Sequence, residues 1–363
     1  MKQYVTCSVL LIISYLSVGR QCYECNFFKK ISVFVTPKSI VPYLKMYTKN
    51  NFSGCFEPKN FDVVVYHLSV VDQIIPELGD HAVYDLPQLM ELSFTGCNIK
   101  NISLRALENL PKLRIIHINH GNLTSISAGI FNDLLNLEDL DLSHNEISYI
   151  QIHTFLHMTS LKQVILSSNK LSSIENDWFS DNPNLTLIDL SYNSIKKIDN
   201  FTFLSTPNLK DLFLDYNQIN HIGKKTFYGL TNMEIVSLRH NRIALLDANI
   251  IPNNFQVHML RLNANFLNFL SHDFLKKIKV NALELTGNPW ICPCLNQIED
   301  WMRQWNVTSL NGGYCKRHNI PKCIYDNSDN ICLEILSSEI TESYLGKLKN
   351  LKIPVDDECA NLS

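Results

Sequence analysis

Apolar residues recur at a fixed spacing along the middle of the chain, and this spacing predicts its architecture. The segments LEDLDLSHNEI from 137, LKQVILSSNKL from 161, LTLIDLSYNSI from 185, LKDLFLDYNQI from 209 and MEIVSLRHNRI from 233 start 24 residues apart. The frame extends backward to 113 and 89, and more weakly to 65. It extends forward to 257 and to a last unit at 280 that is one residue short. The chain therefore carries ten repeated units.

Each unit combines a strand with a return segment. The Leu-x-Leu alternation predicts one short strand per unit, paired in parallel with its neighbours. A second apolar column lies 18 residues after the unit starts, at Val83, Leu107, Phe131, Phe155, Phe179, Phe203, Phe227 and Ile251, while Phe274 lies at 17. No unit can bury its own apolar residues, so stacked units must share a continuous core.

The ninth position of most units predicts a buried polar ladder. It is asparagine at Asn145, Asn169, Asn193, Asn217, Asn241, Asn265 and Asn288. A buried side-chain amide can satisfy backbone groups of the surrounding turns, which would otherwise be costly to bury. Earlier units depart from this pattern with Gln73, Cys97 and Gly121. We expect Cys97 to be a buried free thiol, and the turn at Gly121 to be looser or shifted onto Asn122.

The pattern L-x-x-L-x-L-x-x-N-x-L, with its ten units, resembles the leucine-rich repeat over residues 62–288. The resemblance implies an α/β solenoid with a curved parallel sheet. Such a stack exposes its core at both ends and needs caps. We assign residues 20–61 to an N-terminal cap in which Ile31 to Tyr43 is β-rich, with Cys55 bonded to Cys25 or Cys22.

The C-terminal cap is expected over residues 289–332, where Cys292-Pro-Cys294 follows the last ladder asparagine. This segment resembles the cysteine-rich C-terminal flank of extracellular leucine-rich-repeat proteins. The resemblance implies that Cys292 and Cys294 each pair with a downstream cysteine, namely Cys315 and either Cys323 or Cys332. A zinc site is the alternative for Cys-x-Cys near His318, but an oxidising compartment favours disulfides.

The two ends of the chain suggest secretion. Residues 1–19 read as a signal peptide, with a basic start, an apolar run and small residues before a cleavage point after Gly19. No later stretch is long and apolar enough to span a membrane, so we expect a secreted, extracellular protein. The tail, 333–363, carries spaced apolar residues from Leu333 to Leu351 that predict one amphipathic helix. That helix would pack on the cap, or form a dimer through the tail or Cys359.

Composition and motifs exclude several classes of function. The net charge of −3 gives no basic footprint, which argues against nucleic-acid binding. An apolar content of 45% argues against wholesale disorder. The sequence has no glycine-rich phosphate loop, no G-x-S-x-G and no H-E-x-x-H. We therefore expect no enzyme activity, no cofactor and no metal.

The strands should present a concave binding face. Side chains alternate across a strand, so the second, fourth and sixth residues after each unit start point to the open side, with the seventh at its rim. Apolar, aromatic and charged residues gather there and form our candidate ligand-binding set: Leu187, Asp189, Tyr192, Asp211, Phe213, Asp215, Tyr216, Arg239 and Arg261. Acidic positions beside basic ones would orient a protein partner. His117, His120 and His144 should lie close together, as solvated side chains or as a pH switch or metal site.

Glycosylation acceptors avoid this face. Six N-x-S/T acceptors are candidates, at Asn51, Asn101, Asn122, Asn184, Asn200 and Asn306. Those within the repeats fall outside the three concave columns. Glycans would therefore coat the edges and back, and leave the concave face open.

The repeats, caps and leader together resemble insect secreted leucine-rich proteins, including mosquito leucine-rich immune proteins and Toll-receptor ectodomains. The resemblance implies innate immunity, through recognition of a microbial-surface ligand or an extracellular effector protein. The tail is shorter than the coiled coil of those immune proteins, which corresponds to a short form. The alternatives are an adhesion, matrix or receptor-guidance module, and a structural spacer.

Overall fold

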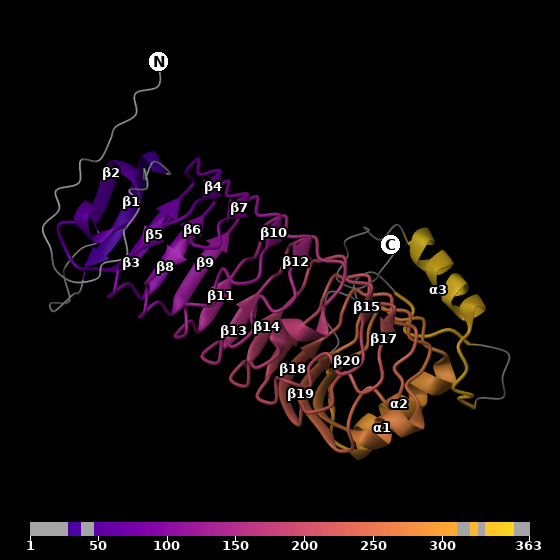
Figure 1. Cartoon of the computed structure of the whole chain (residues 1–363). Coiled ribbons are helices and arrows are strands. Elements are labelled where there is room, and N and C mark those ends of the chain that lie inside the picture. The colour runs from indigo at the N-terminus through magenta and orange to yellow at the C-terminus, as the bar shows by residue number, and fades with distance from the viewer. Residues whose placement is uncertain (1–27, 38–46, 311–319, 326–330, 352–363) are drawn as a thin grey trace, which may run out of the picture.

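The repeated units stack as turns of a solenoid, and their strands form one curved sheet (Figure 1). The computed structural model describes residues 28–37, 47–310, 320–325 and 331–351. The sheet has 13 strands. In spatial order they are β2 (Tyr47–Gly54), β1 (Phe28–Pro37), β3 (Val65–Val71), β6 (Glu91–Thr95), β9 (Ile115–Asn119), β11 (Asp139–Asp141), β13 (Gln163–Ile165), β14 (Leu187–Asp189), β16 (Asp211–Phe213), β18 (Asn232–Ser237), β19 (Phe255–Arg261), β20 (Ile278–Glu284) and β21 (Thr308–Ser309).

The return segments carry short strands and few helices. Four two-stranded parallel ladders pair β4 (Glu77–Leu78) with β7 (Asn101–Ile102), β5 (Val83–Tyr84) with β8 (Leu107–Glu108), β10 (Ser125–Ile126) with β12 (Tyr149–Ile150), and β15 (Lys197–Ile198) with β17 (His221–Ile222). The helices are η1 (Pro58–Asn60), η2 (Asn176–Phe179), α1 (His272–Lys277), α2 (Cys292–Gln304) and α3 (Ser338–Asn350).

Strand register confirms the repeat frame. Asp139 lies opposite Gln163, which lies opposite Leu187, so neighbours in the sheet are 24 residues apart. Between β19 and β20 the offset falls to 23, with Val257 opposite Val280. The shortened last unit is therefore real, and the sheet continues through it in parallel.

The phenylalanine column forms the spine of the core. The ring centroids of Phe131 and Phe155 are 6.5 Å apart, and those of Phe155 and Phe179 are 6.2 Å apart. Phe203 and Phe227 repeat the 6.2 Å spacing. All five side chains are buried, so each turn seals the apolar face of the next, as the repeat pattern predicts.

The asparagine column forms the predicted ladder. The Asn193 side-chain amide donates to the carbonyls of Leu166 (3.0 Å) and Leu190 (3.1 Å), and its oxygen accepts from the Leu171 amide at 2.9 Å. Equivalent bonds recur at Asn145, Asn169, Asn217, Asn241 and Asn265. Each amide thus joins its own turn to the preceding one.

Cys97 and Gly121, two of the three exceptions in the column, behave differently. Cys97 is a buried free thiol, as predicted, and its Sγ lies 3.7 Å from the Val70 carbonyl. The accepting role passes to Asn98, whose oxygen accepts from the Ile75 amide at 2.7 Å.

At Gly121 the prediction of a looser turn shifted onto Asn122 is wrong. The Asn122 amide donates instead to Glu146 Oε1 at 3.2 Å. A Cβ at residue 121 would lie 2.6 Å from the Cys97 carbonyl oxygen and 2.9 Å from Asn145 Oδ1. The turn is therefore tightly packed, and only glycine fits there.

A β-hairpin closes the N-terminal end. β1 pairs antiparallel with both β2 and β3, so the hairpin covers the first parallel strand. Phe28 and Phe56 stack at 4.3 Å beneath it and fill the end of the core. Cys55 is disulfide-bonded, whereas its predicted partners Cys25 and Cys22 lie outside the described residues.

Two disulfides fix the C-terminal cap: Cys292–Cys323 and Cys294–Cys332. The prediction that Cys292 and Cys294 pair downstream is confirmed, but the assignment of Cys315 as one partner is wrong. The reason lies in the backbone: the Cys292 amide donates to the Ile324 carbonyl at 3.0 Å, which brings Cys323 beside Cys292. Cys315 itself lies outside the described residues.

The tail helix starts later than predicted. α3 begins at Ser338, because the Ser337 hydroxyl accepts from the Ile340 amide at 3.2 Å and caps it. The prediction of one amphipathic helix in the tail is confirmed, but its start at Leu333 is wrong. Ile340, Tyr344 and Leu348 are buried against the cap, so the apolar face of α3 is used in packing. Residues 1–19, predicted to be a signal peptide, and Cys359 lie outside the described residues.

Candidate functional site

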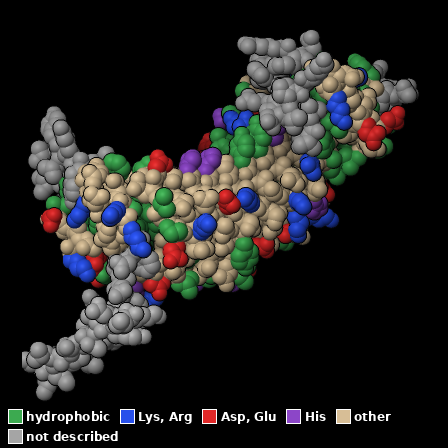
Figure 2. Space-filling view, turned by 90° about the horizontal axis from the view of Figure 1, so that it is seen from above, with side chains coloured by type: hydrophobic (Ala, Val, Ile, Leu, Met, Phe, Trp, Pro, Cys, Tyr) green, Lys and Arg blue, Asp and Glu red, His purple; other side chains and the backbone are tan. Residues whose placement is uncertain are grey.

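The main strands present every second side chain to the open face of the sheet. In β14, Ile188 is fully buried, while Leu187 and Asp189 on either side are half-exposed. The same alternation in β11, β13 and β16 confirms the predicted outward positions. Figure 2 shows histidine and hydrophobic side chains together along the hollowed edge of the arc.

The rim position has a special backbone in every unit. Its residues from unit three to unit eight adopt φ between 51° and 56°: His120, His144, Ser168, Tyr192, Tyr216 and His240. This left-handed conformation is uncommon for non-glycine residues. Its recurrence at the end of each strand places these side chains in one row along the edge of the concave face.

Most of the rim side chains are stacked rings. Tyr192 and Tyr216 lie 4.3 Å apart between centroids, and Tyr216 lies 4.2 Å from His240. His120 and His144 form a second stack at 4.3 Å, which confirms their predicted proximity. Tyr192 is 51% exposed. The sequence singled out the two tyrosines, but their spacing as a stack follows from the sheet.

Carboxylates of the concave face lean toward this rim. Asp189 Oδ1 accepts from the Ser191 amide at 2.9 Å and from its hydroxyl at 2.6 Å. Asp141 Oδ1 accepts in the same way from the Ser143 amide at 2.9 Å. Both carboxylates therefore lie just inside the row of rings.

Two further aspartates are partly desolvated. Burial raises the pKa of Asp139, partly opposed by the charge of His117. Burial also raises the pKa of Asp211, assisted by the negative charge of Glu234. The centre of the face is thus acidic and only partly hydrated, which strengthens its attraction for a cation.

Asp215 is the buried member of the candidate set. The residue is only 4% exposed, and its carboxylate accepts from the Ser237 hydroxyl, the Arg239 amide (3.1 Å) and Arg239 Nε (3.2 Å). Burial raises its pKa, and the bonds from Ser237 and Arg239 oppose that rise. The carboxylate of Asp215, a member of the candidate set, is therefore engaged within the protein. Asp215 holds the Arg239 guanidinium 5.5 Å from the Tyr216 ring centroid.

The basic side of the face is also paired. Arg261 Nε lies 3.9 Å from Glu284 Oε1, and Arg239 is engaged with Asp215. The charge contrast along the face is therefore weaker than the sequence implied. Leu187, Phe213 and Asp189 remain half-exposed beside the rim tyrosines.

The glycosylation acceptors lie off the concave columns. Asn51, Asn101, Asn184, Asn200 and Asn306 are exposed, and Asn122 is half-buried. They differ in local bonding: the Asn184 amide donates to the Thr159 carbonyl at 2.8 Å, and Thr202, the acceptor threonine for Asn200, is buried. Asn306 and Thr308 are both exposed, so this acceptor is accessible in the fold as it stands.

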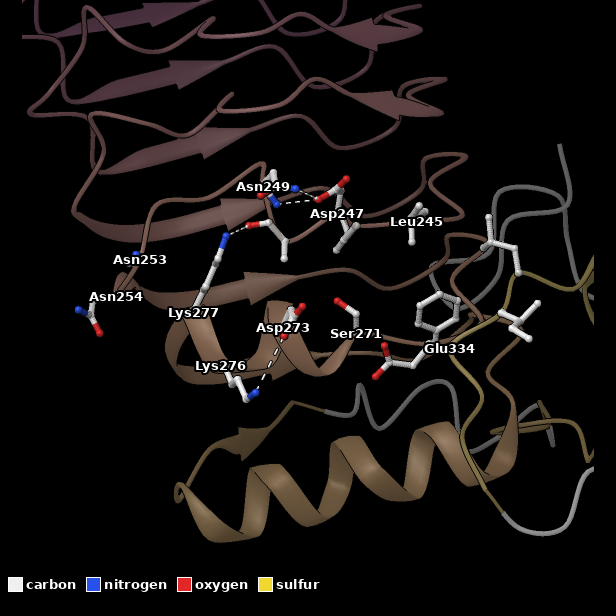
Figure 3. Close-up of a pocket in the computed structure, with 15 residues that line it drawn as sticks. Leu245, Asp247, Asn249, Asn253, Asn254, Ser271, Asp273, Lys276, Lys277 and Glu334 are labelled. Atoms are coloured by element: carbon white, nitrogen blue, oxygen red, sulfur yellow. Dashed lines mark hydrogen bonds and ion pairs between the residues drawn. The ribbon is translucent and has the colours of Figure 1, made fainter.

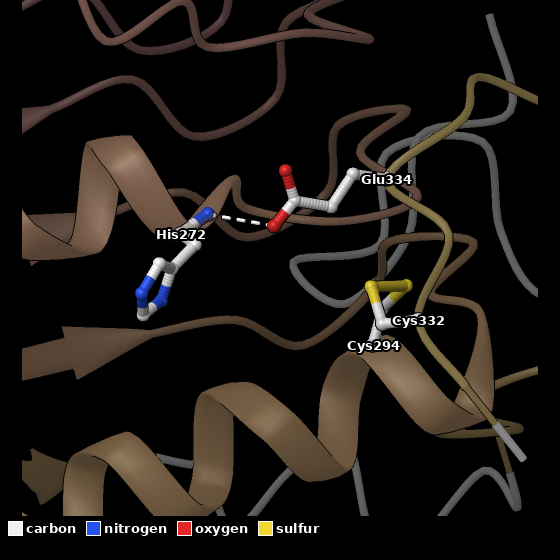
Figure 4. The surroundings of a disulfide bond; sticks show 4 residues. All are labelled: His272, Cys294, Cys332 and Glu334. Carbon is white, nitrogen blue, oxygen red and sulfur yellow. Dashed lines mark hydrogen bonds between the residues drawn. A yellow bond between two sulfur atoms is a disulfide. The ribbon is translucent and has the colours of Figure 1, made fainter.

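A groove of about 1000 Å³ lies beside the C-terminal cap and was not predicted (Figure 3). It is lined by Leu245, by α1 and by the segment before α3. Lys277 reaches across to the Ala248 carbonyl at 2.7 Å. Glu334 accepts from the His272 amide at 2.8 Å, next to the Cys294–Cys332 disulfide (Figure 4). These segments are far apart in sequence, so periodicity carried no signal for the groove.

Comparisons with known proteins agree with the fold. The family model described as leucine rich repeat matches residues 111–171, 159–219, 193–243 and 207–265. The comparison with curated proteins found no match. A chain in the structure of the Toll–Spatzle complex, described as a molecular hub in Drosophila development and innate immunity, has a TM-score of 0.50 and 20% identity. The match covers 63% of this chain and 36% of that chain, and at this identity it shows the fold alone.

Folds of this kind typically serve as non-enzymatic binding scaffolds. Within the described part of the chain, no helix is long and apolar enough to cross a membrane. The repeats, their register, the disulfides of the cap and the match to the leucine-rich-repeat model over residues 111–265 together show that the chain folds as a leucine-rich-repeat solenoid.

Proposed function

We propose that the protein is a secreted recognition protein of innate immunity, and that it binds an extracellular protein or a microbial-surface ligand on its concave face. The observation that carries this proposal is the composition of that face. Leu187, Phe213 and the rim tyrosines lie beside the half-exposed Asp189 and Asp211. Exposed apolar and aromatic residues beside charged groups are typical of protein-binding surfaces.

Each part of the face has a distinct role in this proposal. Tyr192 and Tyr216 supply rigid ring edges that contact the ligand. Asp189 and Asp211 attract and orient a basic patch on the partner, which mainly accelerates association. Asp215 positions Arg239 and does not contact the ligand. The candidate glycans at the edges and back leave this approach open.

The innate-immune assignment rests on the fold resemblance and on this open face. The two disulfides of the cap support secretion, because disulfides form and persist in oxidising compartments outside the cytosol. A dimer through Cys359 or the exposed tail residues stays part of the proposal. Gel electrophoresis without reducing agent, compared with and without Cys359→Ser, tests that part.

The test of function is binding by charge-reversed variants. Purified protein is incubated with killed bacteria, fungal cells and insect haemolymph, and bound partners are quantified. Asp189→Lys with Asp211→Lys should reduce binding at least tenfold. The matched control, Asp133→Lys with Asp177→Lys, changes the same charge at exposed positions outside the concave columns. We expect the control to bind normally.

Equal binding by all three proteins would refute the concave site. Absence of binding to every microbial and haemolymph probe, with binding to cultured epithelial or neuronal cells, would overturn the immune role. That result would favour the adhesion or guidance alternative. Expression in blood cells and fat body, against nervous system or epithelium, separates the two in the animal.

A further inference from the structure

The row of rings along the rim is interrupted at one unit. His120 and His144 stack at 4.3 Å on one side, and Tyr192, Tyr216 and His240 stack at 4.3 and 4.2 Å on the other. Between them the rim residue is Ser168, whose φ of 56° matches that of its neighbours. Its backbone is placed to present a ring, but its side chain is a hydroxymethyl group.

The spacing of the flanking stacks predicts an interruption the size of one ring. Each unit advances the row by the stacking distance, so a planar group above Ser168 would lie one stacking distance from both His144 and Tyr192. That distance is close to the range favoured for stacked planar groups. His144 and Tyr192 are both exposed, and Ser168 is half-buried between them.

The surroundings of this slot favour a cation. Asp141 and Asp189 belong to the units on either side, and Oδ1 of each accepts from the serine amide just before the rim, at Ser143 and Ser191. Oδ2 of Asp141 also accepts from the Asn119 side chain at 2.6 Å, whereas Oδ2 of Asp189 faces the partner in our proposal. The corresponding position of the unit between them is the uncharged Ile165. A planar group that entered the slot would therefore have aromatic faces on two sides and a carboxylate near each of them.

A related contact occurs further along the rim, although Tyr216 there has both faces covered by Tyr192 and His240. The Arg239 guanidinium lies 5.5 Å from the Tyr216 ring centroid, and its Nε donates to Asp215 at 3.2 Å. Guanidinium is planar, stacks on aromatic faces and pairs with carboxylates, whereas a lysine ammonium is compact and strongly hydrated. The rim thus already holds one guanidinium close to a tyrosine ring and paired with an aspartate.

We propose that the gap at Ser168 is a recognition slot that takes an arginine side chain of the protein ligand between His144 and Tyr192. This inference rests on the proposed function, because it names the side chain that the concave face would recognise. It goes further in selecting arginine over lysine and in locating one contact among ten units.

The test uses the full-length chain with ¹³C-labelled histidine and tyrosine rings, observed by NMR. The probe is acetyl-arginine-amide at millimolar concentration, with acetyl-lysine-amide and acetyl-tyrosine-amide as comparisons. We expect saturable shifts of the His144 and Tyr192 ring signals with the arginine probe. The lysine and tyrosine probes should give little or no saturable shift of these signals.

The decisive variant is Ser168→Tyr, which fills the slot with the ring that the neighbouring units carry. Tyr192 and Tyr216 already adopt the same backbone conformation, so we expect no loss of thermal stability. The variant should abolish the response to arginine. Asp72→Tyr adds the same ring at the exposed rim position four units away, where φ is 52°, and should leave the response unchanged.

Three results would overturn the inference: no saturable response to arginine, an equal response to lysine, or a response that persists in Ser168→Tyr. A response to tyrosine alone would show that the slot takes a neutral ring and would refute the arginine assignment. Failure of this inference is separable from failure of the proposed function. If the arginine probe does not bind but ligand binding still depends on Asp189 and Asp211, only the slot is refuted. If the arginine probe binds but charge reversal at Asp189 and Asp211 leaves ligand binding unchanged, the concave site is refuted.

Discussion

The central repeats and the C-terminal cap are held together by different kinds of contact. In the repeats from Asn145 onward, one residue type makes the same bonds in each turn, as Asn193 does with the turn before it. In the cap, single residues join distant segments: Cys294 bonds Cys332, 38 residues away, and Asn268 accepts from the Ser337 amide, 69 residues away. The stability of the repeats is therefore a sum of contributions from neighbouring turns, whereas the stability of the cap depends on a few unique links.

Removing a unique link should have the largest effect. The double substitution Cys294→Ser with Cys332→Ser opens a loop of 38 residues and should lower the free energy of unfolding by about 4 kcal/mol. Hydrogen exchange should show α3 losing protection before the repeats. Cys97→Ala, at the buried free thiol, is the control and should cost about 1 kcal/mol. Comparable losses in the two proteins would contradict the special role of the cap.

Breaking one rung of the ladder comes next. Asn193→Ala leaves the Leu171 amide and the Leu166 and Leu190 carbonyls without their side-chain partner, which should cost about 3 kcal/mol. Urea denaturation measures the loss. Ser194→Ala, in the same turn but half-exposed, should change stability by less than about 0.5 kcal/mol. If both variants unfold at the same urea concentration, the ladder contributes little.

A smaller loss of stability is expected at Asp215, the buried carboxylate of the concave face. Asp215→Ala leaves Ser237 and Arg239 without their acceptor, and we expect a loss of about 2 kcal/mol because Arg239 is only partly desolvated. Asp189→Ala removes a half-exposed carboxylate that accepts from the Ser191 amide and hydroxyl, and it should cost about 1 kcal/mol. A Tm for Asp215→Ala as high as that of Asp189→Ala would show that the pair with Arg239 is not structural.

The smallest effect concerns acid stability. Glu138 accepts from Arg114 Nε at 2.7 Å and from Lys162 at 2.8 Å, and these bonds lower its pKa to about 2. Its contribution to stability is therefore complete above its ordinary pKa of 4.5 and is lost as pH falls toward 2. Glu138→Gln should flatten the dependence of Tm on pH in this window. Asp215 has the opposite effect on acid stability. Burial raises its pKa above the ordinary value, so its protonation as pH falls favours the folded state.

Much of the regular part could be predicted from local sequence. The 24-residue spacing predicted the strands, the phenylalanine spine and the asparagine ladder, because each depends on one residue type repeated in register. Gly121 was misjudged because its constraint comes from the Cys97 carbonyl, in the preceding turn. Cys315 was misassigned because pairing at Cys292 depends on the backbone bridge to Ile324.

The candidate site also has a part that the sequence predicted and a part that it did not. Alternation along the strands located Leu187, Asp189, Asp211 and Phe213 on the outward face. The sequence did not reveal that Asp215 is buried beneath Arg239, because that depends on the neighbouring strand that supplies Ser237. It also did not reveal the gap at Ser168 as a slot, since a slot exists only when rings in adjacent units stack.

By itself, the sequence determined the repeat, the direction in which each strand side chain points and the cysteine count available to the caps. These properties are local, because a period of two along a strand and of 24 along the chain fixes which residues share a face. Only the tertiary structure decided which cysteines pair, where α3 begins, which carboxylate is buried and how far apart the rim rings lie. Those outcomes depend on backbone bonds and packing between segments that are separated in sequence, so no local pattern records them.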